Sequence, residues 1–146
     1  MRSLSVTHAR AISILAITLL GAAIAGAKDG RDFAGFYSLS DVTEVGDRIQ
    51  VTFQLQLFNY SGTPIEGAVV ALHSSAPESG AIARFAPISV WPSGKDVVLI
   101  QTITVARAEF ERWRGHAHPN IFVGYQDLDG QAKRQPAQLN QRAQLP

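Results

Sequence analysis

The chain has 146 residues, no cysteine and 46% hydrophobic residues, and its 13 Lys and Arg against 12 Asp and Glu give a formal net charge of +1. The absence of cysteine excludes a disulfide framework, a lipid-modified N-terminal cysteine and a thiol nucleophile. A charge this close to zero supplies no basic face for phosphate groups, so nucleic acid is not an expected partner.

Residues 1–27 are predicted to be a bacterial signal peptide. A basic start with Arg2 and Arg10 precedes the apolar run 11–24, and Ala25-Gly26-Ala27 has the small-x-small pattern of a cleavage site. The alternative is an uncleaved anchor, but the run is shorter than the ~18 to 20 residues that span a bilayer comfortably. We therefore expect export to the periplasm or beyond the cell, with membrane contact only through the signal peptide before cleavage.

Residues 28–146 are predicted to form one domain with its core within about 34–140. Removing Arg2 and Arg10 leaves 11 basic against 12 acidic residues, so this part carries a net charge of −1. Since no disulfide is available, the domain must be stabilised by a hydrophobic core.

The first predicted strand is 36–45, and the second, 49–58, has the clearest pattern in the chain. Large apolar residues at 49, 51, 53, 55 and 57 alternate with Gln50, Thr52, Gln54 and Gln56. Successive side chains of a strand point to opposite faces, so this pattern predicts one buried face and one uncharged face open to solvent or a partner.

Turn-forming residues follow at 59–64 and again at 74–80 and 91–95. Between them, 65–73 is predicted to be a strand near the centre of its sheet because both of its faces are apolar. Segment 82–90 contains Pro87, which predicts an edge or interrupted strand. Segment 97–105 is a second strong strand.

Residues 107–113 break the β pattern and are predicted to form one or two helical turns, with Phe110 and Trp113 on one side. A strand at 121–126, a hairpin turn at 127–130 and a last strand at 131–139, weakened by Pro136, complete the chain. This succession predicts an antiparallel two-sheet sandwich of about seven strands with one short helical turn, with a closed barrel as the alternative.

The segment Arg48 to Leu72 joins the alternating strand, the turn Asn59-Tyr60-Ser61-Gly62 and the strand beginning at Ile65. It resembles the strand–turn–strand of bacterial extracytoplasmic immunoglobulin-like or fibronectin-III-like modules, and the hairpin from Tyr125 to Gly130 is similar to one near their end. The resemblance implies an immunoglobulin-like sandwich that serves as an adhesive, spacer or assembly unit. It implies no catalytic residues.

His116 and His118 are the candidate metal ligands, because two histidines two apart share one side of an extended chain. A third ligand from His73, Asp127 or Asp129 would be needed, and two solvated loop histidines are the alternative. Asp127 to Gly130 has a weak similarity to a calcium loop but lacks the later acidic ligand, so a hairpin turn is favoured.

No glycine-rich phosphate loop or nucleophile elbow occurs, and the serines fall in turn-like or proline-containing stretches. The carboxylates are scattered, with no pair whose context suggests a raised pKa. The sequence therefore predicts no cofactor and no catalytic residue. The candidate binding residues are Tyr60, Trp91 and Trp113, whose rings can stack on a sugar or anchor a protein, or else cover the ends and edges of the core.

The leading interpretation is an exported, non-catalytic module that binds another protein or an envelope component. The alternatives are a carbohydrate-binding module using the exposed aromatic residues, and a metal-binding protein or hydrolase using the His116 and His118 loop.

Overall fold

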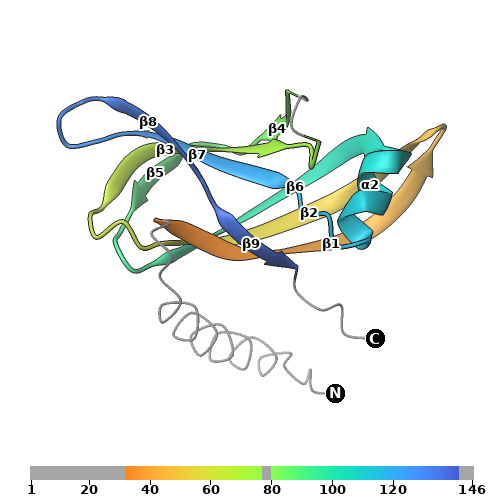
Figure 1. Cartoon of the computed structure of the whole chain (residues 1–146), viewed down its shortest axis with the longest axis horizontal. Helices are drawn as coiled ribbons and strands as arrows, with labels where there is room; N and C mark the ends of the chain where they lie inside the picture. The colour runs from red at the N-terminus through yellow and green to blue at the C-terminus, as the bar shows by residue number, and fades with distance from the viewer. Residues whose placement is uncertain (1–31, 77–79, 142–146) are drawn as a thin grey trace, which may run out of the picture. The chain divides into compact units, whose positions relative to one another are not determined.

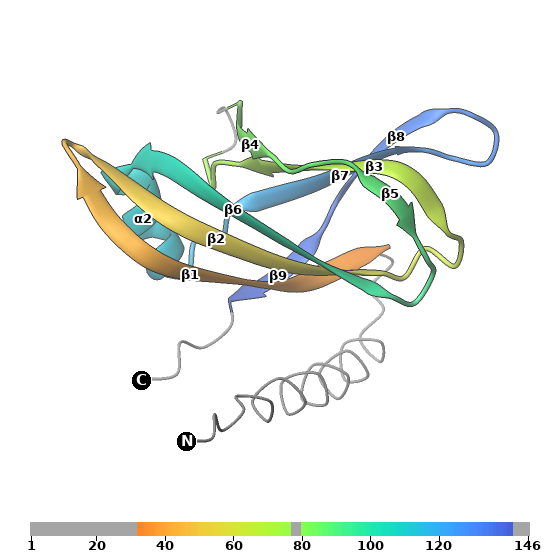
Figure 2. The same cartoon turned by 180° about the vertical axis from the view of Figure 1, so that it is seen from behind.

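The computed structural model describes residues 32–76 and 80–141 of the chain. Within these ranges, nine strands and one helix form two packed sheets with open edges (Figures 1 and 2). The predicted two-sheet architecture is thereby confirmed, and the barrel alternative is wrong because neither sheet closes on itself. The predicted signal peptide, residues 1–27, lies outside the described residues. No helix in the described ranges is both long and apolar enough to cross a bilayer.

The first sheet, sheet I, has four strands in the order β6-β2-β1-β9. They are β1 (Phe33–Val45), β2 (Arg48–Asn59), β6 (Asp96–Ala106) and β9 (Gln138–Gln141). β2 lies between β1 and β6 and is antiparallel to both, whereas β9 runs parallel to β1. The β1–β2 turn passes through Gly46, whose φ of +61° disfavours residues with a Cβ atom.

The second sheet, sheet II, has five strands, and β3 and β7 form its centre. They are β3 (Ile65–His73), β4 (Ala81–Arg84), β5 (Ile88–Trp91), β7 (Asn120–Gln126) and β8 (Ala132–Pro136). One side of β3 pairs with β7, and its other side pairs with β5 and β4 at successive positions. The predicted central position of segment 65–73 is therefore confirmed.

Two predicted strands are each divided in two, which explains why nine strands replace about seven. Segment 82–90 becomes β4 and β5, because Pro87 between them has no N–H for strand pairing. Segment 131–139 becomes β8 in sheet II and β9 in sheet I. After Pro136, the N–H of Ala137 donates to the carbonyl of Ile121 at 2.9 Å, and the chain then crosses to the other sheet.

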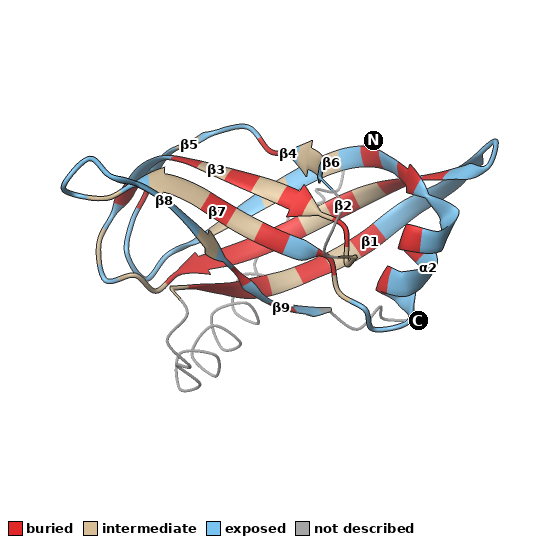
Figure 3. Cartoon of the chain, turned by 45° about the horizontal axis from the view of Figure 1, so that its top comes forward, coloured by how far each residue is buried: buried red, intermediate tan, exposed pale blue. Residues whose placement is uncertain are grey.

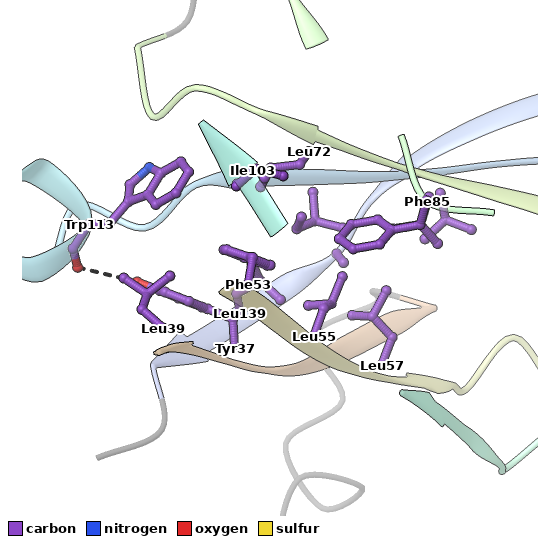
Figure 4. Close-up of a cluster of buried hydrophobic side chains, with 14 of the residues drawn as sticks. Tyr37, Leu39, Phe53, Leu55, Leu57, Leu72, Phe85, Ile103, Trp113 and Leu139 are labelled. Atoms are coloured by element: carbon purple, nitrogen blue, oxygen red, sulfur yellow. Dashed lines mark hydrogen bonds between the residues drawn. The ribbon is translucent and has the colours of Figure 1, made fainter. Parts of the chain in front are cut away.

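The core lies between the sheets and contains the predicted buried face of β2 (Figure 3). Its five alternating residues are at most 2% exposed: Ile49, Val51, Phe53, Leu55 and Leu57. The ring of Phe53 stacks on Tyr37 at 5.4 Å between centroids and meets Trp113 edge-on at 5.7 Å (Figure 4). Each such buried side chain stabilises the fold by about 1.5–3 kcal/mol relative to exposure.

Helix α2 (Arg107–Arg114) follows β6 directly and confirms the predicted helical turns. Figure 1 shows it at one end of the two sheets, where Phe110 and Trp113 are buried in the core. The helix ends at Gly115, whose N–H donates to the carbonyls of Glu111 and Arg112. The amphipathic turn thus covers an end of the core that the strands leave open.

Candidate interaction surface

Strand β6 is one free edge of sheet I, because β2 pairs with one of its sides and no described strand pairs with the other. At the opposite edge, β9 covers only residues 34–37 of β1, and the uncovered part of β1 carries Asp41 and Glu44. Segment 97–105, which we call the β6 edge, contains neither a charged residue nor a proline. A strand in this position presents unpaired backbone N–H and C=O groups along its outer side, and another strand can pair with them. The β6 edge is therefore the longest uncharged strand edge among the described residues.

The β6 edge carries aliphatic side chains on both faces, beside the uncharged polar residues Gln101, Thr102 and Thr104. Toward the interior, Val97 and Leu99 are only half-buried, although Ile103 and Val105 are buried. Toward the outside, Val98 is 48% and Ile100 is 62% exposed. Covering exposed aliphatic side chains with a partner strand removes apolar surface from water and therefore stabilises the complex.

The outer face of sheet I continues this uncharged surface across β2. The register of the β2–β6 pair places Gln54 beside Ile100 and Thr52 beside Thr102. Arg48 and Asp96 mark its two ends, and no charged residue lies between them on the outer sides of β2 and β6. The predicted glutamine face is thus present, although one of its members differs from the prediction.

Gln56 belongs to that face by alternation but is only 4% exposed. Its Nε2 donates to the Oδ2 of Asp96 at 2.8 Å across the β2–β6 pair. A hydrogen bond to a charged acceptor offsets the cost of burying the amide. The exposed part of the face therefore runs from Gln50 to Gln54 and continues over the β6 edge.

The remaining edges of the two sheets are poorer templates for a partner strand. β4 and β5 are four residues each and are separated by Pro87. β8 carries Lys133, Arg134 and Pro136 within five residues, and β9 has only four residues. Short length, charge and proline are the features that protect strand edges from pairing. The β6 edge carries none of these protections.

Glu109 is the centre of a buried polar cluster at the junction of α2 and the end of β3. Its side chain projects from the first turn of α2, and the residue is 4% exposed. Its carboxylate accepts hydrogen bonds from Ser74 Oγ at 2.5 Å, from Ser75 N at 2.7 Å and from Trp113 Nε1 at 2.6 Å. Arg112 completes the cluster with an ion pair to the same carboxylate. The cluster ties the helix to the end of β3.

The environment of Glu109 has two opposing effects on its ionisation. Burial disfavours the charged form, but the hydrogen bonds from Ser74, Ser75, Arg112 and Trp113 together outweigh it and lower the pKa of Glu109. The carboxylate is therefore ionised at neutral pH and shared among donors of its own chain. This arrangement is that of a structural anchor.

A groove of about 660 Å³ lies where the β2–β3 and β7–β8 connections meet, and Asp32, Glu66, Asp127, Asp129 and Lys133 are its charged lining residues. Asp127 Oδ1 accepts the N–H groups of Asp129 and Gln131, both at 2.9 Å. The hydrogen bond from Gln131 is the largest of the contributions that lower the pKa of Asp127, and Lys133 contributes further. Asp127 thus serves the predicted hairpin turn, in which Gly130 has a φ of +77°.

The three candidate aromatic residues occupy different environments. Trp91 and Trp113 are both 0% exposed, and Trp91 Nε1 donates to the carbonyl of Lys95 at 2.9 Å. Tyr60 is half-buried and stacks on Phe58, with ring centroids 5.8 Å apart. Stacking on a sugar needs an exposed ring face, which neither indole offers in this structure. Tyr60 is the candidate that retains exposed surface.

The two candidate histidines are not brought together with a third ligand. His116 is exposed with a φ of +71°, whereas His118 Nδ1 lies 3.0 Å from the hydroxyl of Tyr37. His73 stacks edge-on against Phe122 and contacts Arg134 at 3.2 Å. Across residues 32–76 and 80–141, no group of three His, Asp or Glu side chains is placed to hold a metal ion.

Within residues 32–76 and 80–141, these features define an open two-sheet β-sandwich with one helix and with a long, uncharged strand edge at β6. The chain matches no protein-family model, and comparisons with curated proteins and with solved structures found no match. Its function is therefore inferred from its own geometry.

Sequence reasoning missed both the Glu109 cluster and the position of the free edge. The spacing of Glu109 and Trp113, four residues apart in a helix, signals that they can touch. Their contact with Ser74 depends on how α2 meets the end of β3, which no local pattern encodes. Similarly, the absence of charge in segment 97–105 is visible in the sequence, whereas its position at an edge follows from the strand order.

Proposed function

We propose that this chain is an exported, non-catalytic protein-interaction module that binds its partner by adding a strand at the β6 edge. The observation that carries the proposal is the combination of a strand side with no described strand paired to it, missing charge and exposed Ile100 on one long strand. One of its carbonyls, that of Thr104 near the strand end, accepts a hydrogen bond from Arg48 Nη2 at 3.1 Å. In strand addition, the main chain supplies affinity and the alternating side chains supply specificity. Half-buried Val97 and Leu99 would be covered by the inward side chains of the added strand.

The proposal includes an immunoglobulin-like topology for the sandwich. In immunoglobulin domains, the first, second and fifth strands share one sheet, and the third, sixth and seventh share the other. Here β1, β2 and β6 share sheet I, whereas β3, β7 and β8 share sheet II. Helix α2 connects β6 to β7, and no further strand lies outside β6 among the described residues. That unoccupied side is where the partner strand would add.

Export is proposed from the N-terminal sequence, with its basic start, apolar run and Ala25-Gly26-Ala27 motif. Fractionation of the producing bacterium tests this proposal. We expect the protein outside the cytoplasm, shortened by about the length of the signal peptide. Recovery of the full-length chain from the cytoplasm alone would contradict it.

A non-catalytic role is supported by how the chain uses its reactive groups. The carboxylate of Glu109 is shared among four residues of the chain, and His118 is paired with the hydroxyl of Tyr37. These contacts give both groups structural partners within the chain, which supports the proposal. Their geometry favours structure over chemistry.

Site-specific photocrosslinking in the producing cell tests the binding edge. A photoreactive residue at position 100 is expected to form an adduct with a protein. The matched control is position 90, where Val90 is 57% exposed on β5 in the other sheet. Adducts at position 90 but not at position 100, or adducts at neither position, would overturn the proposal.

A further inference from the structure

The inward row of strand β6 (Val97, Leu99, Gln101, Ile103 and Val105) has the same polarity pattern in both chain directions. Its centre is Gln101, the midpoint of Asp96–Ala106. An antiparallel pair of two β6 strands centred on Gln101 would place Leu99 opposite Ile103 and Ile100 opposite Thr102. It would also place Val97 opposite Val105 and Val98 opposite Thr104, so every pair within the β6 edge is uncharged.

Gln101 is the one polar residue in the inward row of this strand, between Leu99 and Ile103, and it is half-buried. Its side-chain amide makes no hydrogen bond to another described residue. A primary amide carries both donors and an acceptor, so two amides related by a two-fold axis can each donate to the other. In coiled coils, a single self-pairing amide in an apolar seam fixes the register between identical helices, and the same physical argument applies to two identical β-strands.

We propose that the strand added at the β6 edge is β6 of a second copy of this chain, paired antiparallel about a two-fold axis at Gln101. This inference rests on the proposed function and names its partner. The two copies of sheet I would form one continuous sheet, with their inward rows on the same side. Such an interface is isologous, since each copy presents the same surface to the other.

The charges near the strand ends are compatible with this pairing. Asp96 would lie opposite Ala106 of the second copy, and it is already held by Gln56 within its own chain. Lys95 and Arg107 would lie just beyond the ends of the pair. Arg107 is compensated by Glu44 at 2.9 Å in the same chain, which limits repulsion between these two cations.

Charge substitutions at Gln101 test the two-fold axis. We expect the wild-type full chain to have twice the mass of one chain by light scattering. Gln101→Glu and Gln101→Lys each place like charges opposite each other, so each variant alone should dissociate at least about tenfold more readily. An equimolar mixture of the two should recover the doubled mass, because Glu then faces Lys.

Two further measurements make the outcome specific. Acidification below about pH 4 should return Gln101→Glu toward the dimer, because its new carboxylates lose their charge. Gln138→Glu makes the same chemical change at an exposed position on β9, at the opposite edge of sheet I, and should leave the mass doubled. Circular dichroism of every variant checks that it is folded, and the recovery on mixing excludes misfolding as the cause of dissociation.

Several results would overturn the inference. These are a wild-type mass of one chain throughout a dilution series, a doubled mass that persists in both charged variants, or no recovery on mixing. A single-chain mass together with photoadducts to a different protein at position 100 would refute the second copy and leave the proposed function standing. A single-chain mass with no adduct at that position would refute both.

Discussion

Replacing Glu109 by alanine is expected to be among the most destabilising single substitutions in this chain. It removes a buried acceptor that serves Ser74, Ser75 and Trp113 at 2.5 to 2.7 Å and also pairs with Arg112. Hydrogen bonds to charged groups contribute about 1.5–3 kcal/mol each but are not additive within one cluster. We therefore expect a loss of about 3–5 kcal/mol in the free energy of unfolding, a large fraction of the ~5–15 kcal/mol typical of a domain.

The isosteric Glu109→Gln separates charge from shape. It keeps one acceptor oxygen but places an amide NH2 near Arg112 or the serine donors, so we expect a smaller loss of about 1–2 kcal/mol. The contribution of the carboxylate is fully present above its unfolded pKa of about 4.3. Because the folded pKa of Glu109 is lowered, that contribution is lost as the pH falls through the folded pKa. The difference between wild type and Glu109→Gln should therefore shrink at acid pH.

Urea unfolding followed by tryptophan fluorescence measures both effects, at neutral pH and at about pH 3. The matched control is Glu111→Gln on the same helix, where an exposed carboxylate lies 3.7 Å from Arg114. Exposed pairs of this kind contribute less than about 1 kcal/mol. A loss below about 1 kcal/mol for Glu109→Ala, or equal losses for the alanine variant and the control, would refute the anchoring role of Glu109.

Three further predictions follow from close packing and buried polar groups. Gly35→Ala should destabilise the β1–β2 pair by about 3 kcal/mol or more, because the new Cβ would lie 1.9 Å from the backbone oxygen of Gln56; an unchanged melting temperature would contradict this. Trp91→Phe should lower the free energy of unfolding, measured in urea, by about 1–3 kcal/mol, because the carbonyl of Lys95 loses the indole donor. An unchanged free energy of unfolding would show that this hydrogen bond is dispensable. Burial raises the pKa of Tyr37 to about 12, so the free energy of unfolding should fall as the pH rises from about 10 to 12. Tyr37→Phe should make this fall less steep. An equally steep fall in the variant would show that Tyr37 is not its cause.

The local patterns of the sequence were sufficient to predict most of the elements. Strict alternation in 49–58 predicted a strand with one buried face, and all five of its alternating apolar residues are buried. Pro87 predicted the interruption between β4 and β5, and the helical turns at 107–113 were confirmed as α2. These features depend on residue spacing and backbone chemistry, which a single sequence displays directly.

Features that depend on the relation between distant segments were not predictable in the same way. The chain changes sheets after Pro136, so one predicted strand became β8 and β9, and only the tertiary packing specifies that crossing. The aromatic candidates show the same limit. Trp91 and Trp113 occur beside turns and helix ends, where binding residues are common, yet the fold encloses both indoles. Sequence position alone did not distinguish a recognition residue from a core residue.

The most direct test of the central claim is amide hydrogen exchange along β6 in the native, assembled protein. Amides that point toward β2 are protected by the sheet in any case, whereas those that point away are protected only when another strand is paired there. The account predicts slow exchange at every amide from Val97 to Val105. Fast exchange at alternate residues of this segment, as at an open edge, would contradict the claim that β6 receives a partner strand.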